Sequence, residues 1–256
     1  MARIISIVNQ KGGVGKTTTS INLAAWLAAF GKRVLIIDID PQGNASSGLG
    51  IDYKNLSKGM YEVLVDPNTR ISEVIRSYQP NFHILPTTPD LAGAAIDLVE
   101  TSDREFQLDK QIKEIADLYD FILIDNPPSL GLLTINGLVA SREIIIPVQC
   151  EYYALEGLSQ LLNTINLIKE HLQPDLNILG AVMTMYDSRN KLANDVFNEL
   201  YRYFPAKIFR SVIPRNIKIA ESPSHGLPLK DYAPNSVGSN AYKRLAQEVM
   251  LAKLIN

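Results

Sequence analysis

The sequence has almost no cysteine, no long apolar run and little excess charge. Cys150 is the single cysteine, which excludes an intramolecular disulfide framework and fits a reducing cytoplasm. No run approaches the roughly 18 apolar residues that cross a membrane, and the apolar start Arg3–Val8 is too short for a secretory signal. Because the formal net charge is only −2, any binding to nucleic acid must come from a local basic surface.

What the sequence does contain is a regular alternation of apolar and amphipathic segments. The apolar segments, rich in branched residues, are expected to be strands: Ile4–Val8, Arg33–Ile37, Phe82–Leu85, Phe121–Ile124, Glu143–Val148 and Ile178–Met185. The amphipathic segments are expected to be helices: Thr17–Phe30, Phe106–Leu118, Leu132–Ser141, Ala154–Leu172, Ala193–Tyr203 and Ser239–Leu254. This pattern predicts an α/β fold, a mostly parallel twisted sheet with helices on both faces, formed by residues 1–256 as a single domain. The proline clusters Pro86–Pro89 and Pro223–Pro234 are expected to be surface loops.

The segment after the first expected strand has the composition of a phosphate-binding loop. Its glycines let backbone N–H groups converge on phosphate oxygens, and the dipole of the following helix favours the anion. Lys16 can reach the β- and γ-phosphates, and the Thr17 hydroxyl can ligate magnesium, which predicts ATP with Mg²⁺ as the ligand. The expected nucleotide-binding residues of the loop are Lys11, Gly12, Gly13, Val14, Gly15, Lys16, Thr17 and Thr18. The loop departs from the usual pattern because Gln10 replaces its first glycine and Lys11 adds a second lysine.

Acidic residues follow two of the expected strands. Asp38 and Asp40 come after Arg33–Ile37, and Asp125 comes after Phe121–Ile124, at the sheet edge where open parallel sheets bind ligands. We expect Asp125 to hold magnesium-bound waters, Asp40 to orient the attacking water, and Asp38 to support the metal. The expected metal set is Thr17, Asp38, Asp40 and Asp125. An aspartate after a strand can instead cap a helix or form an Asx turn, and this alternative stays open.

These motifs together resemble the deviant Walker A ATPases of the ParA/MinD family. Lys11 stands at the position of the family's signature lysine, Asp38–Asn44 resembles its first switch, and Ile124–Ser129 resembles its Walker B motif and second switch. Asn126 departs from the Cys, Ala or Thr that the second switch usually has. Similarity to chromosomal ParA (Soj) proteins in particular is carried by Thr88–Ala94, Thr184–Arg189 and Ile213–Asn216.

The resemblance implies a dimerising P-loop ATPase. Two ATP-bound subunits would form a nucleotide sandwich in which Lys11 of one subunit reaches the phosphates of the other, with Asp40, Lys11 and Lys16 as the catalytic residues. The adenine is expected near Met185, Pro214, Arg215 and Asn216. The resemblance also implies a homodimer, a ParB-type centromere-binding partner, and a nucleoid-associated role in segregating or positioning chromosomal or plasmid DNA.

A local excess of basic residues lies between Asp187 and Lys218: Arg189, Lys191, Arg202, Lys207, Arg210, Arg215 and Lys218. A solvated face is the ordinary explanation of such a cluster. The Soj resemblance at Arg189 and Lys218 favours contact with DNA phosphates, which would be independent of sequence and sensitive to salt.

Three other kinds of protein share this type of nucleotide site. A MinD-like positioning ATPase binds membrane through a basic amphipathic tail, whereas Ser239–Leu254 has the pattern of a packed terminal helix, and no membrane partner is expected. A nitrogenase-type reductase is excluded, because each subunit must supply two cysteines to a shared cluster. A dethiobiotin-synthetase-like ligase is not excluded, but the Soj-like segments argue against it.

Overall fold

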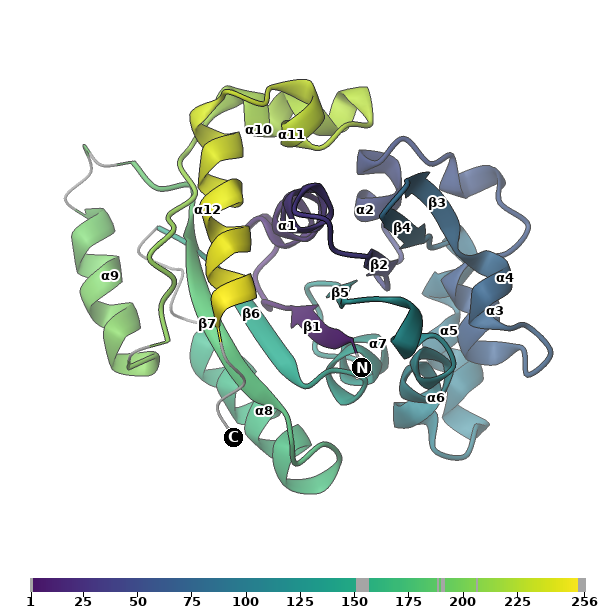
Figure 1. The fold of residues 1–256 in the computed structure, drawn as a ribbon. Helices are drawn as coiled ribbons and strands as arrows, with labels where there is room; N and C mark the ends of the chain where they lie inside the picture. Colours follow the sequence, from purple (N-terminus) through teal and green to yellow (C-terminus); the bar gives the residue numbers. More distant parts are fainter. Residues whose placement is uncertain (1, 151–156, 188, 190–191, 206, 253–256) are drawn as a thin grey trace.

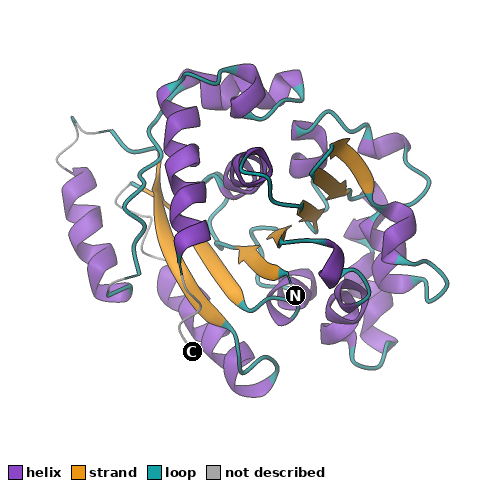
Figure 2. Ribbon diagram, viewed as in Figure 1, coloured by secondary structure: helices purple, strands orange, loops and turns teal. Residues whose placement is uncertain are grey.

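The computed structural model describes residues 2–150, 157–187, 189, 192–205 and 207–252. They form a seven-stranded sheet in the order β3-β4-β2-β5-β1-β6-β7, with helices on both faces (Figure 1; Figure 2). The strands are β1 (Arg3–Ile7), β2 (Val34–Asp38), β3 (Arg76–Gln79), β4 (Phe82–Leu85), β5 (Phe121–Asp125), β6 (Glu143–Gln149) and β7 (Asn177–Thr184). Neighbouring strands are parallel except β3 and β4, which pair antiparallel at one edge. The predicted α/β fold with a mostly parallel sheet is confirmed.

The helices range from one turn to about four turns in length. The α-helices of the described chain are α1 (Lys16–Ala29), α2 (Asn44–Gly48), α3 (Met60–Val65), α4 (Ile71–Val74), α5 (Ala94–Asp97), α6 (Gln107–Lys113), α7 (Leu132–Val139), α8 (Leu158–His171), α9 (Leu192–Tyr203), α10 (Ile217–Glu221), α11 (Leu229–Tyr232) and α12 (Val237–Leu251). Two short 3₁₀ helices near the site are η1 (Tyr53–Asn55) and η7 (Ser222–His225). None of the helices in the part of the chain that the structure describes could span a membrane.

Three apolar clusters hold the helices against the sheet. Helices α1 and α12 cover one face, where Leu23 and Leu245 are fully buried. Helices α3, α5 and α6 cover the other face around Leu35 and Ile122, and helices α7, α8 and α9 pack with β6 and β7 in the third cluster. Burying one such side chain contributes about 1.5–3 kcal/mol, so these layers hold the strand ends that carry the site in fixed positions.

All six expected strands are present, and none of their ends differs from the expected one by more than one residue. Strand β3 was not predicted, because Arg-Ser-Tyr-Gln is a polar and partly exposed edge segment without the apolar pattern of a buried strand. The expected helices are also present, except that Phe106–Leu118 is divided into α6 and a short 3₁₀ helix at Ala116–Leu118. The ends expected at Ala154 and Leu254 lie outside the described residues.

The prediction that the two proline clusters are surface loops was wrong in part. Pro86, Thr87 and Thr88 are buried, and the Pro86 carbonyl accepts a hydrogen bond from the Met60 amide at 2.9 Å. The second cluster contains η7 and α11 rather than an open loop. Proline is compatible with the first turn of a helix, so its presence alone did not distinguish a loop from a short helix.

Candidate active site

The phosphate loop joins β1 to α1, and polar contacts of Asn9 hold its start. Gly13 and Gly15 have φ angles of 74° and 90°, which glycine adopts without strain. Asn9 accepts a hydrogen bond from the Lys11 amide at 3.0 Å and donates to the Pro147 carbonyl of β6 at 2.7 Å. These contacts shape the loop at the N-terminus of α1, where unpaired helix N–H groups favour an anion.

A second contact fixes the middle of the loop to β7. The Thr184 hydroxyl donates to the Val14 carbonyl at 2.8 Å. Neither Asn9 nor Thr184 was predicted as a site residue. Asn9 could have been suspected because it immediately precedes the loop, whereas the contact from Thr184 depends on the pairing of β6 with β7 and carries no local sequence signal.

Lys16 lies inside the loop with its ammonium group nearly enclosed. Its Nζ donates to the Lys11 carbonyl at 3.3 Å, and the residue is 7% exposed. Burial lowers the pKa of Lys16, while the carboxylates of Asp125 and Asp40 oppose that shift. The lysine is therefore placed among the acidic groups that the sequence predicted as its neighbours.

Asp125 receives hydrogen bonds from two hydroxyls of α1. Its Oδ2 accepts from Thr17 Oγ1 at 2.8 Å, and its Oδ1 accepts from Ser20 Oγ at 2.8 Å. The carboxylate is fully buried, and burial raises its pKa. Ser20 was not predicted, although it lies three residues after Thr17 and therefore on the same face of the helix.

Asp38 is buried at the end of β2, beside Asp125 in the β2–β5 register. Its Oδ2 accepts from the amide and the hydroxyl of Ser46, at 2.8 and 2.7 Å, and its Oδ1 accepts from the Asp40 amide at 3.3 Å. Burial and the neighbouring Asp125 raise the pKa of Asp38. Asp38 therefore holds α2 against the end of β2. Like Asp125, it does not line the cavity described below, and its support of the metal stays a prediction.

Asp40 forms the Asx turn that the sequence left open as an alternative, and it also lines the cavity described below. Its Oδ1 accepts from the Gln42 amide at 3.0 Å, which is the Asx turn expected of an aspartate after a strand. The residue is nevertheless 5% exposed and lines the cavity beside Lys16 and Thr17.

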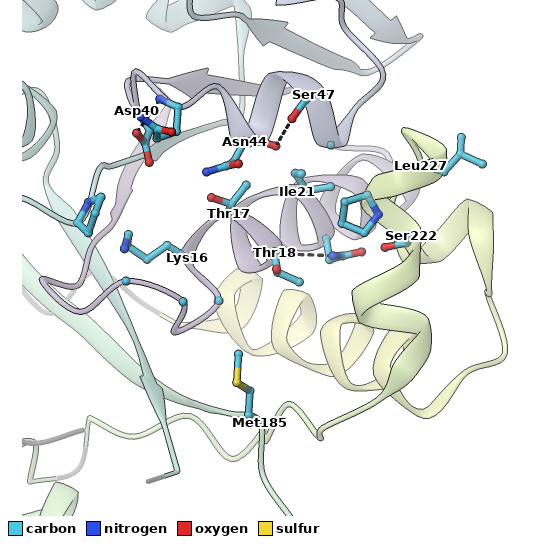
Figure 3. Close-up of a pocket in the computed structure, with 18 residues that line it drawn as sticks. Lys16, Thr17, Thr18, Ile21, Asp40, Asn44, Ser47, Met185, Ser222 and Leu227 are labelled. Carbon is cyan, nitrogen blue, oxygen red and sulfur yellow. Dashed lines mark hydrogen bonds between the residues drawn. The ribbon is translucent and has the colours of Figure 1, made fainter. Parts of the chain in front are cut away.

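A cavity of about 460 Å³ lies above the phosphate loop. Figure 3 shows Lys16, Thr17 and Asp40 around its opening, with Met185 beyond the loop. It is lined by Gly12, Gly13, Gly15, Lys16, Thr17, Thr18, Ile21, Asn22, Asp40, Gln42, Asn44, Ser47, Gly48, Pro128, Met185, Ser222, Pro223 and Leu227. The contributions of α2 and of residues 222–227 were not predicted, because they come from short segments that only the fold brings to the loop.

A second cavity of about 270 Å³ adjoins the first and contains the residues expected around adenine. Met185, Pro214, Arg215 and Asn216 all line it, together with Tyr242 of α12. The two cavities share lining residues, namely Gly15, Thr18, Met185 and Pro223. A ligand with phosphates at one end and a flat base at the other can therefore occupy both.

Asn126, the departure in the second switch, points into the core. Its Nδ2 donates to the carbonyls of Ile7 and Ile124 at 3.2 and 3.1 Å, and to Ser6 Oγ at 3.3 Å. Its neighbour two residues on, Pro128, lines the cavity instead. The substitution thus changes packing beneath the switch rather than the surface that faces a nucleotide.

The donors around the loop fit magnesium. In the described ranges no three His, Cys, Asp or Glu side chains are placed to ligate one metal ion together. Magnesium keeps several waters and binds one or two protein oxygens plus phosphates, so it does not need such a cage. The Thr17 hydroxyl with the Asp125 carboxylate behind it supplies the hard oxygen donors that this mode requires.

The two expected DNA contacts lie on the surface in ion pairs. Arg189 pairs with Asp187 at 2.7 Å, is 88% exposed, and lowers the pKa of that carboxyl to about 2. Lys218 pairs with Glu221 at 2.9 Å and lies 5.6 Å from the centroid of the Tyr232 ring. Lys191 of the basic cluster lies outside the described residues.

Comparison with known proteins places the chain in a family. The family described as AAA domain matches residues 2–178. The chain is 53% identical over 249 residues to the sporulation initiation inhibitor protein Soj of Bacillus subtilis, covering 97% of this chain and 98% of that protein. It is 48% identical to the chromosome-partitioning ATPase Soj of Treponema pallidum, covering 98% of both.

The chain is also similar to a solved structure that contains a bound nucleotide analogue. Cobyrinic acid a,c-diamide synthase from Mycobacterium smegmatis, with an ATP analogue and magnesium bound, has a TM-score of 0.87 and 35% identity, over 98% of this chain and 95% of that one. The sequence identity to the two Soj proteins is higher than to this synthase, and those matches also cover nearly the whole chain. This chain therefore belongs to the family of Soj and ParA chromosome-partitioning ATPases.

Proposed function

We propose that this chain is an ATP-driven switch that segregates or positions chromosomal or plasmid DNA. ATP with Mg²⁺ brings two copies together, the dimer holds DNA without sequence preference, and hydrolysis stimulated by a ParB-type partner releases it. One observation carries the proposal: Lys16, Asp40 and Thr17, whose hydroxyl is held by the buried Asp125, line one cavity in a chain that matches Soj proteins over nearly its whole length.

Nucleotide binding follows from charge and shape. Lys16 and the N-terminus of α1 would neutralise the phosphates, and the second cavity, with Met185 and Asn216, would take the base. Thr17 would bind magnesium directly, while Asp125 would hold the Thr17 hydroxyl and magnesium-bound water. The metal would neutralise the charge of the β- and γ-phosphates.

Hydrolysis is assigned to Asp40. Its carboxylate lines the cavity near Lys16, and the Asx turn to Gln42 fixes the orientation of the side chain. A carboxylate held in this way can orient an attacking water toward the terminal phosphate. Asp38 would act indirectly, because its contacts to Ser46 hold the segment that carries Asp40.

Dimerisation is assigned to Lys11. It precedes the glycines of the loop and does not line the cavity of its own subunit, whereas Lys16 does. In the proposed dimer Lys11 would approach the phosphates of the second subunit. The terminal phosphate would then bias a two-state equilibrium toward the dimer, and its loss would reverse that bias.

DNA contact is assigned to Arg189 and Lys218. Exposed ion pairs such as Arg189–Asp187 are weak because water screens both charges, so a phosphate can compete for the cation. A dimer doubles the number of contacts, which makes retention on DNA dependent on ATP. The MinD-like alternative is less well supported, because the apolar face of α12 packs on α1 and is therefore not presented to a membrane.

The test is DNA co-sedimentation with ATP, with ADP and without nucleotide, in parallel with light scattering. We expect dimers and DNA retention only with ATP, and retention that falls steeply with salt. Lys11→Ala is the matched variant, expected to bind ATP as a monomer and to lose both properties. ATP-dependent binding to anionic liposomes without DNA binding would support the MinD-like alternative and refute the proposal.

A further inference from the structure

Tyr53 of η1 covers the turn that carries Asp40. Gly43 in this turn has a φ of 63°, and a methyl group added to it would lie 2.6 Å from Cζ of the Tyr53 ring. The ring therefore occupies the space that a side chain at position 43 would need. The Tyr53 hydroxyl also donates to the Gln42 carbonyl at 2.9 Å, so the same side chain holds the turn by contact and by a hydrogen bond.

The contacts made by Tyr53 continue to the carboxylate of Asp40. The Gln42 amide donates to Asp40 Oδ1 at 3.0 Å, and the Gly43 amide donates to the Asp40 carbonyl at 2.9 Å. Asp40 and Gln42 both line the cavity, whereas Tyr53 does not. Gln42 therefore links the two side chains: its carbonyl accepts from Tyr53, and its amide donates to Asp40.

We propose that Tyr53 is a positioning residue for ATP hydrolysis, acting through Gln42 on the orientation of Asp40. The proposal rests on the role assigned to Asp40 under the proposed function. Glycine at position 43 permits many backbone conformations, so the turn sequence alone does not fix one of them. The ring and hydroxyl of Tyr53 restrict that freedom and hold the carboxylate in the orientation that reaction requires. Tyr53 itself touches neither the nucleotide cavity nor the reacting atoms.

The first test is Tyr53→Phe, measured by steady-state ATP hydrolysis. The variant keeps the ring and loses only the hydrogen bond to Gln42. We expect kcat to fall about threefold to tenfold, as for the loss of one neutral hydrogen bond, while KM for ATP stays within about twofold. Tyr61→Phe is the matched control, because Tyr61 in α3 loses a hydroxyl contact of 2.9 Å to Asp97 of α5, and its kinetics should equal those of the wild type.

The second test uses the contact between the ring and the turn. Gly43→Ala should lower kcat, because its methyl group meets the ring, and Tyr53→Ala should lower kcat because the turn loses its cover. The double variant should lose less than the product of the two single losses, because the methyl group no longer meets a ring. Strictly multiplicative losses would overturn the proposal.

Further outcomes separate this proposal from its premise. Asp40→Asn, run alongside, tests the premise: wild-type turnover in that variant would remove the assigned role of Asp40. With Asp40→Asn impaired, wild-type kcat in Tyr53→Phe would overturn the positioning role alone. A raised KM with unchanged kcat, or a loss of kcat that follows a lowered melting temperature, would equally overturn it by indicating nucleotide binding or folding instead.

Discussion

The contact between Asn126 and Gly137 predicts a reversal in the effect of one substitution. Gly137 lies within α7, where alanine is normally preferred over glycine by about 1 kcal/mol. Here a methyl group at position 137 would overlap Asn126 Oδ1 and would lie 3.2 Å from Asn126 Cγ and 3.3 Å from Ile124 Cγ2. We therefore expect Gly137→Ala to destabilise the wild-type protein and to stabilise an Asn126→Ala variant.

The magnitudes follow from the packing. Overpacking a buried site costs about 1–3 kcal/mol, which exceeds the gain in helix propensity, so Gly137→Ala should lower the free energy of unfolding by about 1–2 kcal/mol. Asn126→Ala loses three hydrogen bonds from Nδ2, but it also removes an Oδ1 atom that accepts none from the described residues. In the double variant the new methyl group occupies space that the carboxamide has left. The interaction free energy of the pair should then be about 1–3 kcal/mol in favour of the double variant.

Urea unfolding of the four proteins without nucleotide measures this interaction. For a chain of this size, about 1 kcal/mol corresponds to a shift of about 2–4 °C in melting temperature, which thermal unfolding resolves. Gly131→Ala is the comparison, because a methyl group there meets only Ser129 Oγ at 3.8 Å. Additive effects of Asn126→Ala and Gly137→Ala would show that the two residues do not constrain each other and would refute the reasoning.

Three further predictions concern the proposed cycle. Lys16→Ala should abolish ATP binding in calorimetry, since the phosphates lose their enclosed cation; unchanged affinity would contradict the assignment. Gly12→Val should spare ATP binding, because a Cβ at position 12 meets nothing within 4 Å in one subunit. It should block ATP-induced dimers, because the branched side chain would occupy the proposed interface. Dimers of this variant in light scattering would argue against a tight interface there. Arg189→Ala should weaken DNA binding equally across sequences and reduce the slope of log K against log salt by about 1. Equal retention at matched salt would assign Arg189 to its ion pair with Asp187 alone.

The fold and the centre of the site were predictable because their signals are local. The apolar strands and the loop from Lys11 to Thr18 are contiguous segments whose composition limits what they can form. Asp40 and Asp125 were predictable for a related reason: Asp125 ends one parallel strand, Asp40 closely follows the end of another, and parallel strands end at the same edge of a sheet. The nucleotide, the metal and the family follow from these positions.

Other features depended on side-chain geometry that residue type alone does not specify. The sequence predicts that Asp38 supports the metal, and only the structure shows that its carboxylate also accepts hydrogen bonds from Ser46 in α2. Likewise, Arg189 and Lys218 were identified by charge, but their ion pairs with Asp187 and Glu221 depend on the local backbone geometry.

By itself the sequence determined the order of the buried strands and the longer helices and the chemistry of the phosphate loop, because backbone geometry and residue type act over a few neighbouring residues. The tertiary structure decided which groups support that loop. Thr184 reaches Val14 across the sheet, and Tyr53 covers the turn of Asp40 from a separate segment. Such contacts join segments that the packing of the core brings together, so no local sequence pattern predicts them.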